Sequence, residues 1–522
     1  MGHTRRWVYC FTVAWGASLM WLAPRLPMVE LPRHAAQVGL VRDLVSGASP
    51  WGHLVRVELQ ATSFLEYGPL LILSFLIPIQ AAYSLLLTLA YVGSVVGCVW
   101  LRAEMNGDER LDWLFVPGFF GFAWKLGLVG ALVSLPAGVL FFGLARRHAE
   151  QPSLRRGAQL AAVGLILFFA NGLVFPYVLL VGLAVLLAHR PRRDPRSAAR
   201  LAPYAGLASL ALGYGLISSR SAMPPGSAMA PAWEGGAAAI PGRVAGLFLH
   251  PFGLDRDHAF ALVALIVFLA PVLSGCRLNR SSPGWWAPFS ITAILSLAAP
   301  SSALGTPHLH GRVALFLLPF YALLFTRPSP EISASRARRA GAIAAAAALP
   351  LACWAFFAVQ TVRLRAFARE SADAHHLLGL VPKGKRLLSL VPDPSSRAAQ
   401  NPAAYLHHAA WYQARHRGLV EPSVSSGAPQ IVHLRDDGAP PALPDLESAP
   451  LAFDFHLHRG RSYDYFLVRD NHPETPALVD RLLDNGECHV ERAASSGEWV
   501  LLARGDCLPA PGQTSPRAAR RE

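Results

Sequence analysis

Residues 80–101 read QAAYSLLLTLAYVGSVVGCVWL, a stretch that holds no charged side chain. A helix of about 20 such residues crosses the roughly 30 Å hydrocarbon core of a bilayer. Comparable stretches recur along the first two thirds of the chain. Its composition is 53% hydrophobic and only 15% charged, whereas a soluble domain carries about a quarter charged residues. The sequence therefore predicts an all-α polytopic membrane bundle of about 11–12 transmembrane helices. The expected crossings are about 7–24, 68–78, 80–101, 111–123, 126–145, 158–171, 173–189, 201–218, 259–276, 285–303, 312–326 and 338–361.

The formal net charge is +14, and its distribution indicates topology rather than a nucleic-acid partner. Arginines gather in short segments between the apolar stretches, as expected of cytoplasmic loops. These segments are 5–6, 146–156, 190–200, 277–280 and 327–339. The loops at about 25–67, 220–258 and 304–311, and the chain after 361, then lie outside. Segment 68–78 contains Pro69 and ends at Pro78, so we expect it to be re-entrant or to merge with the next helix.

Composition changes at residue 363, which divides the chain into a membrane part (1–362), a polar part (363–510) and a tail (511–522). The polar part has short strand-like runs and is long enough for a small α/β domain, which the topology places on the outer face. The tail is expected to be disordered. Cys488 and Cys507 flank a predicted β-hairpin. They form a disulfide if the domain faces an oxidising compartment and are ordinary thiols if it does not.

The stretch Glu30-Leu31-Pro32-Arg33-His34 directly follows the first apolar segment, which we expect to remain uncleaved. A carboxylate and an imidazole at a membrane edge favour a functional interpretation. After Pro32, apolar residues recur at helical spacing, which predicts an amphipathic helix along the membrane surface. Glu30 precedes that helix, so the alternative is a glutamate that caps its exposed N–H groups.

Three motifs resemble bacterial members of the GT-C glycosyltransferase superfamily, which are polytopic enzymes that use polyprenyl-phosphate-linked sugars. The first is acidic-x-Pro-x-His, formed by Glu30, Pro32 and His34. The others are the aromatic-glycine run at residues 118–122 and the late outside loop at residues 308–312. The resemblance implies a bacterial inner-membrane enzyme with a periplasmic C-terminal domain. It would transfer a hexosyl or pentosyl group with inversion to a glycan, lipid or protein acceptor.

In such an enzyme a carboxylate takes the proton of the acceptor hydroxyl, and a cation binds the departing lipid phosphate. The resemblance implies Glu30 as the general base, with His34 orienting it or contacting the acceptor. It places Arg312, His310 and His308 on the donor phosphate. The alternative for this second group is an arginine that reaches the membrane surface from a helix end, beside two loop histidines.

One departure from the family concerns acidic residues, because many members carry a pair in the first loop and Glu30 has no acidic neighbour. The other acids of that loop, Asp43, Glu58 and Glu66, are secondary candidates. The sequence predicts no metal site, since the histidine pairs 375–376 and 407–408 lack a convincing ligand set nearby. Participation of a divalent cation stays open.

Two other classes of function compete with the enzyme. A transporter or flippase would need a polar path through the bilayer centre, but the apolar segments hold few charges and no internal repeat. A non-catalytic membrane scaffold would leave the candidate residues scattered. An enzyme requires Glu30, the 304–312 loop and a groove between helices to converge.

Overall fold

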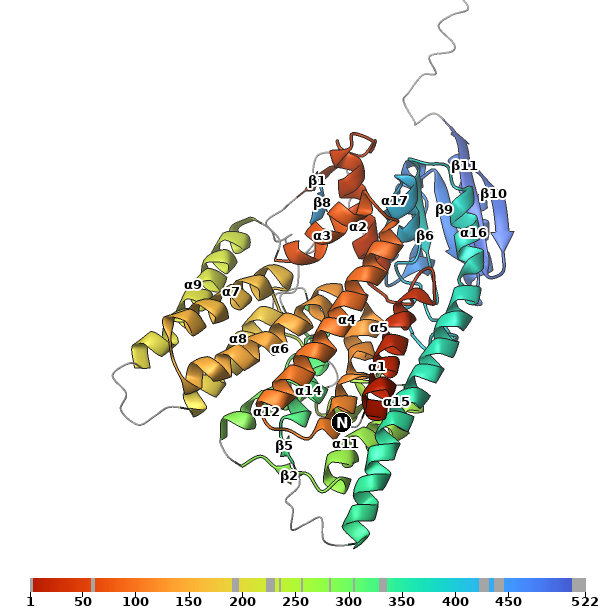
Figure 1. Cartoon of the computed structure of the whole chain (residues 1–522). Coiled ribbons are helices and arrows are strands. Elements are labelled where there is room, and N and C mark those ends of the chain that lie inside the picture. Colours follow the sequence, from red (N-terminus) through yellow and green to blue (C-terminus); the bar gives the residue numbers. More distant parts are fainter. Residues whose placement is uncertain are drawn as a thin grey trace, which may run out of the picture. The chain divides into compact units, whose positions relative to one another are not determined.

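The computed structural model is mainly helical, with a sheet region near its C-terminus (Figure 1). It describes residues 3–57, 62–189, 197–221, 231–233, 236–254, 257–280, 283–303, 306–327, 336–421, 431–435 and 446–508. The chain divides into two compact units. The first comprises Met1–Leu31, Leu59–Ala366 and Gly427–Pro429, and the second comprises Pro32–Glu58, Phe367–Ser426 and Gln430–Glu522.

Helices make up nearly all of the first unit. The α-helices are α1 (His3–Ser18), α3 (Phe64–Ser74), α4 (Ile79–Glu104), α5 (Phe122–Leu126), α6 (Val129–Glu150), α7 (Leu154–Ala170), α8 (Val174–Ala188), α9 (Ser197–Ser221), α10 (Ile240–Leu249), α11 (Ala261–Leu273), α12 (Ala287–Ala298), α13 (Leu309–Arg312) and α14 (Leu317–Ala322). The long helix α15 (Arg336–Glu370) begins in this unit. Two short strand pairs join β2 (Arg277–Leu278) to β5 (Phe325–Thr326) and β3 (Ser302–Ala303) to β4 (Thr306–Pro307).

Within the described residues, three helical runs are long and apolar enough to cross a membrane: Ile79–Glu104, Val129–Glu150 and Ile343–Leu380. The other apolar helices are shorter, among them α3, α8 and α12. Pro78 separates α3 from α4, so the apolar run at 68–101 forms two helices. The expected alternative that segment 68–78 merges with the next helix is therefore wrong.

Two of these membrane-length helices, α4 and α6, run parallel and pack through glycine. An added Cβ would lie 3.4 Å from Pro136 at Gly93, and 3.5 Å from Val139 at Gly97. These contacts advance in the same direction along both helices, which makes the pair parallel. Small residues four apart allow such close approach between apolar helices. At 1.5 Å per residue, α6 is about 33 Å long, which matches the thickness of the hydrocarbon core.

The segment that connects the end of α4 to the start of α6 is not a single helix. The prediction of a helical crossing at 111–123 is wrong: the segment forms the 3₁₀ helices η2 (Glu109–Phe115) and η3 (Gly118–Phe120), followed by α5. Pro117 and two glycines interrupt a regular α-helix. Every residue from 111 to 125 is buried, and protein cover of this kind is what non-helical backbone requires at membrane depth.

The second unit is built on a five-stranded sheet of order β10-β11-β9-β6-β7. Its strands are β6 (Arg386–Leu390), β7 (Leu419–Glu421), β9 (Tyr465–Arg469), β10 (Cys488–Ser496) and β11 (Trp499–Cys507). Strand β6 is parallel to β7 and β9, whereas β11 is antiparallel to β9 and β10. The predicted strands and hairpin are therefore confirmed. Helices α16 (Ala372–Leu380), α17 (Ala410–His416) and α18 (Thr475–Leu483) complete this α/β arrangement.

Alternating side chains on these strands face two separate apolar cores. Leu387 and Leu467 belong to one core, while Leu388 and Phe466 belong to the other. This period of two is what a sheet covered on both faces requires, since successive residues of a strand point to opposite sides. The sequence boundary at 363 lies close to the observed start of this segment at Phe367. The expected tail lies outside the described residues.

The predicted helix after Glu30 is confirmed as α2 (Leu31–Val45). Protein covers it, whereas the sequence predicted that it lies along the membrane surface. From Pro32 onward it belongs to the second unit, not to the membrane part as the sequence boundary at 362 had assigned it. Gly39 packs against the Ala414 backbone of α17, and an added Cβ would lie 2.8 Å from Cα of Ala414. The Gln413 amide also donates to the carbonyl of Ala36 (3.3 Å). The apolar face is thus covered by protein, because amphipathic periodicity specifies a buried face but not what buries it.

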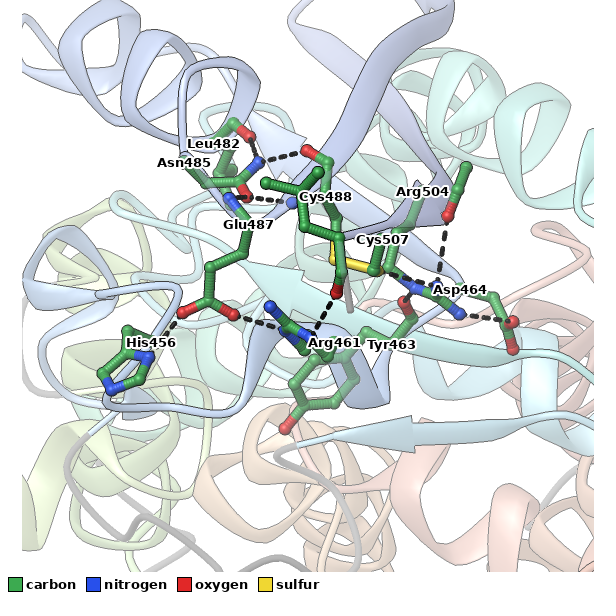
Figure 2. Close-up of a disulfide and its surroundings, with 12 residues drawn as sticks. His456, Arg461, Tyr463, Asp464, Leu482, Asn485, Glu487, Cys488, Arg504 and Cys507 are labelled. Carbon is green, nitrogen blue, oxygen red and sulfur yellow. Dashed lines mark hydrogen bonds and ion pairs between the residues drawn. A yellow bond between two sulfur atoms is a disulfide. The ribbon is translucent and has the colours of Figure 1, made fainter. Parts of the chain in front are cut away.

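A disulfide joins Cys488 and Cys507 at the ends of β10 and β11 (Figure 2). Around it, Glu487 contacts Arg461 at 2.6 Å and also His456. The Asn485 amide donates to the carbonyls of Leu482 and Cys488 (2.8 and 3.0 Å). These contacts fix the end of the hairpin against the loops beside it.

We expect the double variant Cys488→Ala, Cys507→Ala to lose about 3 kcal/mol of stability, as for other crosslinks of similar span. The bond closes a segment with a sequence separation of 19 and so restricts the unfolded chain. Urea unfolding of the purified protein, with and without reductant, measures the effect. Cys10→Ala is the control, because Cys10 is a free, exposed thiol. Equal unfolding midpoints for both variants would contradict the prediction.

Candidate functional site

The backbone at Glu30 is attached to the segment that precedes α6. The N–H of Glu30 donates to the carbonyl of Leu126 (2.9 Å), and the N–H of Val29 donates to the carbonyl of Lys125 (3.3 Å). Gly127 allows this approach, since its φ is +75° and an added Cβ would lie 2.9 Å from the backbone nitrogen of Leu31. The half-buried residue Glu30 is therefore held through its backbone beside the end of α5, shortly before α6 begins.

We expect Gly127→Ala to destabilise the protein by about 2 kcal/mol, since a left-handed conformation costs an L residue about 1–2 kcal/mol before any clash. The displaced Glu30 backbone should also lower any activity that depends on this carboxylate. Apparent unfolding temperature in detergent is the measurement. Gly213→Ala is the matched control, because nothing lies within 4 Å of its added Cβ, and alanine favours a helix interior by about 0.5–1 kcal/mol. Equal destabilisation by both changes would refute the role of Gly127.

Arg312 is the last residue of α13 and lies within electrostatic reach of Glu30. The Glu30 carboxylate contributes a favourable Coulomb interaction to the charged guanidinium, which is largely removed from water. The two residues are far apart in sequence, and both belong to the first unit. Partial burial strengthens such a pair, because the effective dielectric constant is lower than in water.

Arg312 also lines a cavity of about 160 Å³. The other lining residues are Ala131, Asn171, Leu173, Val174, Tyr177, Leu295, Ala299, Leu309, Val313 and Phe316. Its walls are therefore mostly aliphatic and aromatic, with the guanidinium and the Asn171 amide as polar groups. An apolar cavity of about 150 Å³ holds a group the size of benzene. This space therefore fits a short section of an apolar chain or one ring, not a complete lipid.

His308 and His310 lie around Phe122 of α5. The rings of Phe122 and His308 are 5.9 Å apart, and His308 is exposed with a left-handed backbone (φ 57°). The ring centroids of His310 and His250 are 6.1 Å apart, and the His250 ring is tilted against that of Phe122, with 4.7 Å between their centroids. His250 is buried, and sequence reasoning missed it because a single histidine before Pro251 carries no motif.

Glu66 lies in the first turn of α3 and is completely buried. It accepts a hydrogen bond from the N–H of Gly130 in the first turn of α6. An added Cβ on Gly130 would lie 2.7 Å from Oε2 of Glu66 and 2.8 Å from Nδ2 of Asn171, so both side chains converge there. Burial raises the pKa of Glu66 to about 8. Glu66, one of the secondary candidates, therefore lies near Asn171, and Asn171 lines the Arg312 cavity.

Lys125 is a further buried ionisable group. The structure buries it in α5, with 2% of its surface exposed. Burial and the nearby Arg363 lower its pKa to about 8, against the opposing effect of Asp257. Arg363 binds Asp257 through two hydrogen bonds of 2.6 and 3.0 Å. The backbone carbonyl of Lys125 contacts Val29, so this cluster adjoins the segment that carries Glu30.

The remaining candidates lie elsewhere. His34 and Asp43 both occupy α2, and from Pro32 onward this helix is part of the second unit. Asp43 is buried there and pairs with Arg42 at 3.0 Å. Glu58 lies outside the described residues. Among the described residues, no group of three or more His, Cys, Asp or Glu side chains is arranged to hold a metal ion. His375 and His408 do meet, with 3.2 Å between their Nε2 atoms.

Comparisons with protein-family models, with curated proteins and with solved structures found no match.

Proposed function

We propose that this protein is a GT-C-like membrane glycosyltransferase that transfers a sugar from a polyprenyl-phosphate donor to a cell-envelope acceptor. In this proposal Glu30 is the general base, and Arg312 binds the phosphate that leaves the anomeric carbon. The chain would cross a bacterial inner membrane about 11–12 times, with its C-terminal domain in the periplasm. The single observation that supports the proposal best is the favourable electrostatic interaction of Glu30 with Arg312, a residue that lines an apolar cavity.

The chemistry explains why this pairing is useful. Sugar transfer needs a carboxylate to accept a proton and a cation to stabilise the departing phosphate, both near one reacting carbon. An arginine presents a planar fork that matches phosphate oxygens. Aliphatic walls beside it suit the first carbons of a lipid that follow the phosphate. Electrostatic attraction to Glu30 would favour the charged guanidinium until a donor enters.

The positions of the acidic and basic residues along α6 further support the proposed function. Glu30 and Glu66 adjoin the start of α6, whereas Arg146 and Arg147 lie near its end. The positive-inside rule places the arginine-rich end in the cytoplasm. Since α6 is about as long as the hydrocarbon core is thick, the Glu30 end would face the periplasm, where polyprenyl-phosphate sugars are used.

The buried Glu66 and Lys125 favour a proton-coupled transporter as the second candidate. Ionisable groups within a helical membrane protein mark proton paths in many carriers, and both groups have a pKa of about 8. A transporter predicts substrate uptake into vesicles that contain the protein. The enzyme predicts release of polyprenyl phosphate from the donor. A non-catalytic scaffold predicts neither.

Arg312→Lys tests the proposed phosphate contact. In detergent extracts of a deletion strain complemented with this variant, we expect the KM for the polyprenyl-phosphate sugar to rise roughly 10- to 100-fold. This factor corresponds to one lost charge-assisted hydrogen bond of about 1.5–3 kcal/mol. Lysine keeps the positive charge but loses the fork. The measurement is released polyprenyl phosphate as a function of donor concentration.

Arg243→Lys is the matched control, because Arg243 donates to the carbonyls of Leu297 and Ala299 (2.9 and 2.6 Å) and does not line the cavity. Its KM should be unchanged. The proposal fails if envelope glycans are the same in the deletion strain and the wild type and extracts release no polyprenyl phosphate.

A further inference from the structure

A second cavity lies at the opposite end of the α4–α6 pair and has a different chemical character. It encloses about 410 Å³. Its lining residues are Glu104, Met105, Asn106, Arg146, Asn279, Arg280, Trp285 and Thr326. Most of these are polar or charged, in contrast to the apolar walls beside Arg312. The proposed sugar transfer has no use for this cavity, since Arg146 lies about 26 Å along α6 from the end of that helix near Glu30.

Arg146 is held in one orientation at this cavity. Its Nη1 donates to the carbonyl of Glu104 (3.0 Å), and its Nε contacts Glu150 (2.9 Å). The guanidinium carbon lies 4.9 Å from the ring centre of Trp285, and a cation over an indole face is attracted by its π-electrons. A guanidinium fixed in this way loses little conformational entropy when it binds an anion.

The charge that remains around the cavity is positive. The Glu104 carboxylate is already bound by Arg147, whose Nη2 lies 2.7 Å away. Arg280 lines the cavity and is exposed, and it forms no ion pair with any residue that the structure describes. The cavity therefore offers the charge of Arg280 to an incoming anion, together with the guanidinium of Arg146, whose orientation Glu150 and the Glu104 carbonyl fix.

The position of the cavity indicates which anion. It adjoins the C-terminal ends of two membrane-length helices, and in the proposed topology these ends lie where the bilayer surface meets water. Trp286 lies there as well, and its indole N–H donates to the carbonyl of Asn279 (2.7 Å). Tryptophan is enriched at membrane surfaces. Basic pockets between helices on the cytoplasmic side take up the headgroups of anionic lipids.

We propose that this cavity binds the phosphate of an anionic phospholipid headgroup, with Arg146 and Arg280 as the phosphate ligands and Trp285 as one wall. A volume of about 410 Å³ accommodates a headgroup, and the lipid chains remain in the bilayer. The inference does not depend on the sugar transfer, because no residue of this cavity takes part in it.

The test uses the full-length protein in nanodiscs of phosphatidylcholine with and without phosphatidylglycerol brominated near its headgroup. Bromine quenches nearby tryptophan, so we expect preferential quenching by brominated phosphatidylglycerol over brominated phosphatidylcholine. Arg280→Gln should weaken this preference about fivefold, the factor that corresponds to roughly 1 kcal/mol per surface arginine. Arg280 is exposed, so the substitution leaves the core intact.

Arg155→Gln is the matched control, since it removes the same charge from an exposed arginine in the adjacent first turn of α7. It should leave the preference unchanged. Equal loss in both variants would show general surface attraction and overturn the site. The lipid assignment would be overturned in favour of a free-phosphate site by one combined result. In it, inorganic phosphate competes as effectively as glycerol phosphate, and quenching shows no preference between the two lipids.

Discussion

Glu30→Gln is expected to lower sugar transfer by about 10²–10⁴-fold, the usual contribution of a general base. Glutamine keeps the size of the side chain and its ability to accept a hydrogen bond, but it does not take up a proton at neutral pH. The backbone bonds that place this residue use its N–H and not its side chain, so the variant should insert and fold. The measurement is single-turnover release of polyprenyl phosphate in detergent extracts, together with the amount of inserted protein.

Two controls separate this effect from general charge loss. Glu491→Gln removes an acid from β10 whose side chain is 68% exposed, and it should retain full transfer. Glu58→Gln removes another acid of the same expected loop and should also be active. Wild-type transfer by a stably inserted Glu30→Gln protein, with no other loop acid required, would rule out the assignment of the base.

The stability of the protein is expected to fall as pH rises from about 4.5 to about 8 because of Glu66. Burial raises the pKa of this carboxyl from 4.5 to about 8. The folded protein therefore holds a proton here that the unfolded chain releases above about pH 4.5. Its contribution to stability is complete below that pH and is lost as pH rises through about 8, at roughly 1.4 kcal/mol per pH unit across the window.

Glu66→Gln should flatten this dependence, since glutamine resembles the protonated carboxyl and can still accept from the N–H of Gly130. Apparent unfolding temperatures between pH 5 and 9 measure the effect, and the variant should be the more stable protein at the alkaline end. Asp43→Asn serves as a comparison, because Asp43 is a buried acid already paired with Arg42. Parallel pH profiles for the wild type and Glu66→Gln would contradict the proton assignment.

Much of the local structure was accessible from sequence, because it depends on neighbours along the chain. The uncharged run at 80–101 became the membrane-length helix α4, and the spacing of apolar residues after Pro32 became α2. The short strand-like runs at 386–391 and 465–468 became β6 and β9. Such signals depend on residues that are neighbours along the chain, so they record the geometry of one element.

The sequence was less informative where competing local signals met. Residues 111–123 are apolar enough for a helix, but proline and glycine divide this region into two 3₁₀ helices and the start of the short helix α5, an arrangement that requires protein cover at membrane depth. Likewise, the pattern of α2 identified its buried face without naming α17 as the partner. Both outcomes depend on what surrounds the segment, which a single stretch of sequence does not contain.

The sequence by itself determined a mainly helical chain with membrane-length apolar helices, a later sheet region and a set of charged residues in its loops. Only the tertiary structure decided which of these charges meet. It brought Glu30 within electrostatic reach of Arg312, placed Glu66 of α3 against the first turn of α6, and gathered Arg146 and Arg280 at a second cavity. The physical reason is that hydrophobic periodicity is a local property, whereas the meeting of distant charges depends on how whole helices pack against one another.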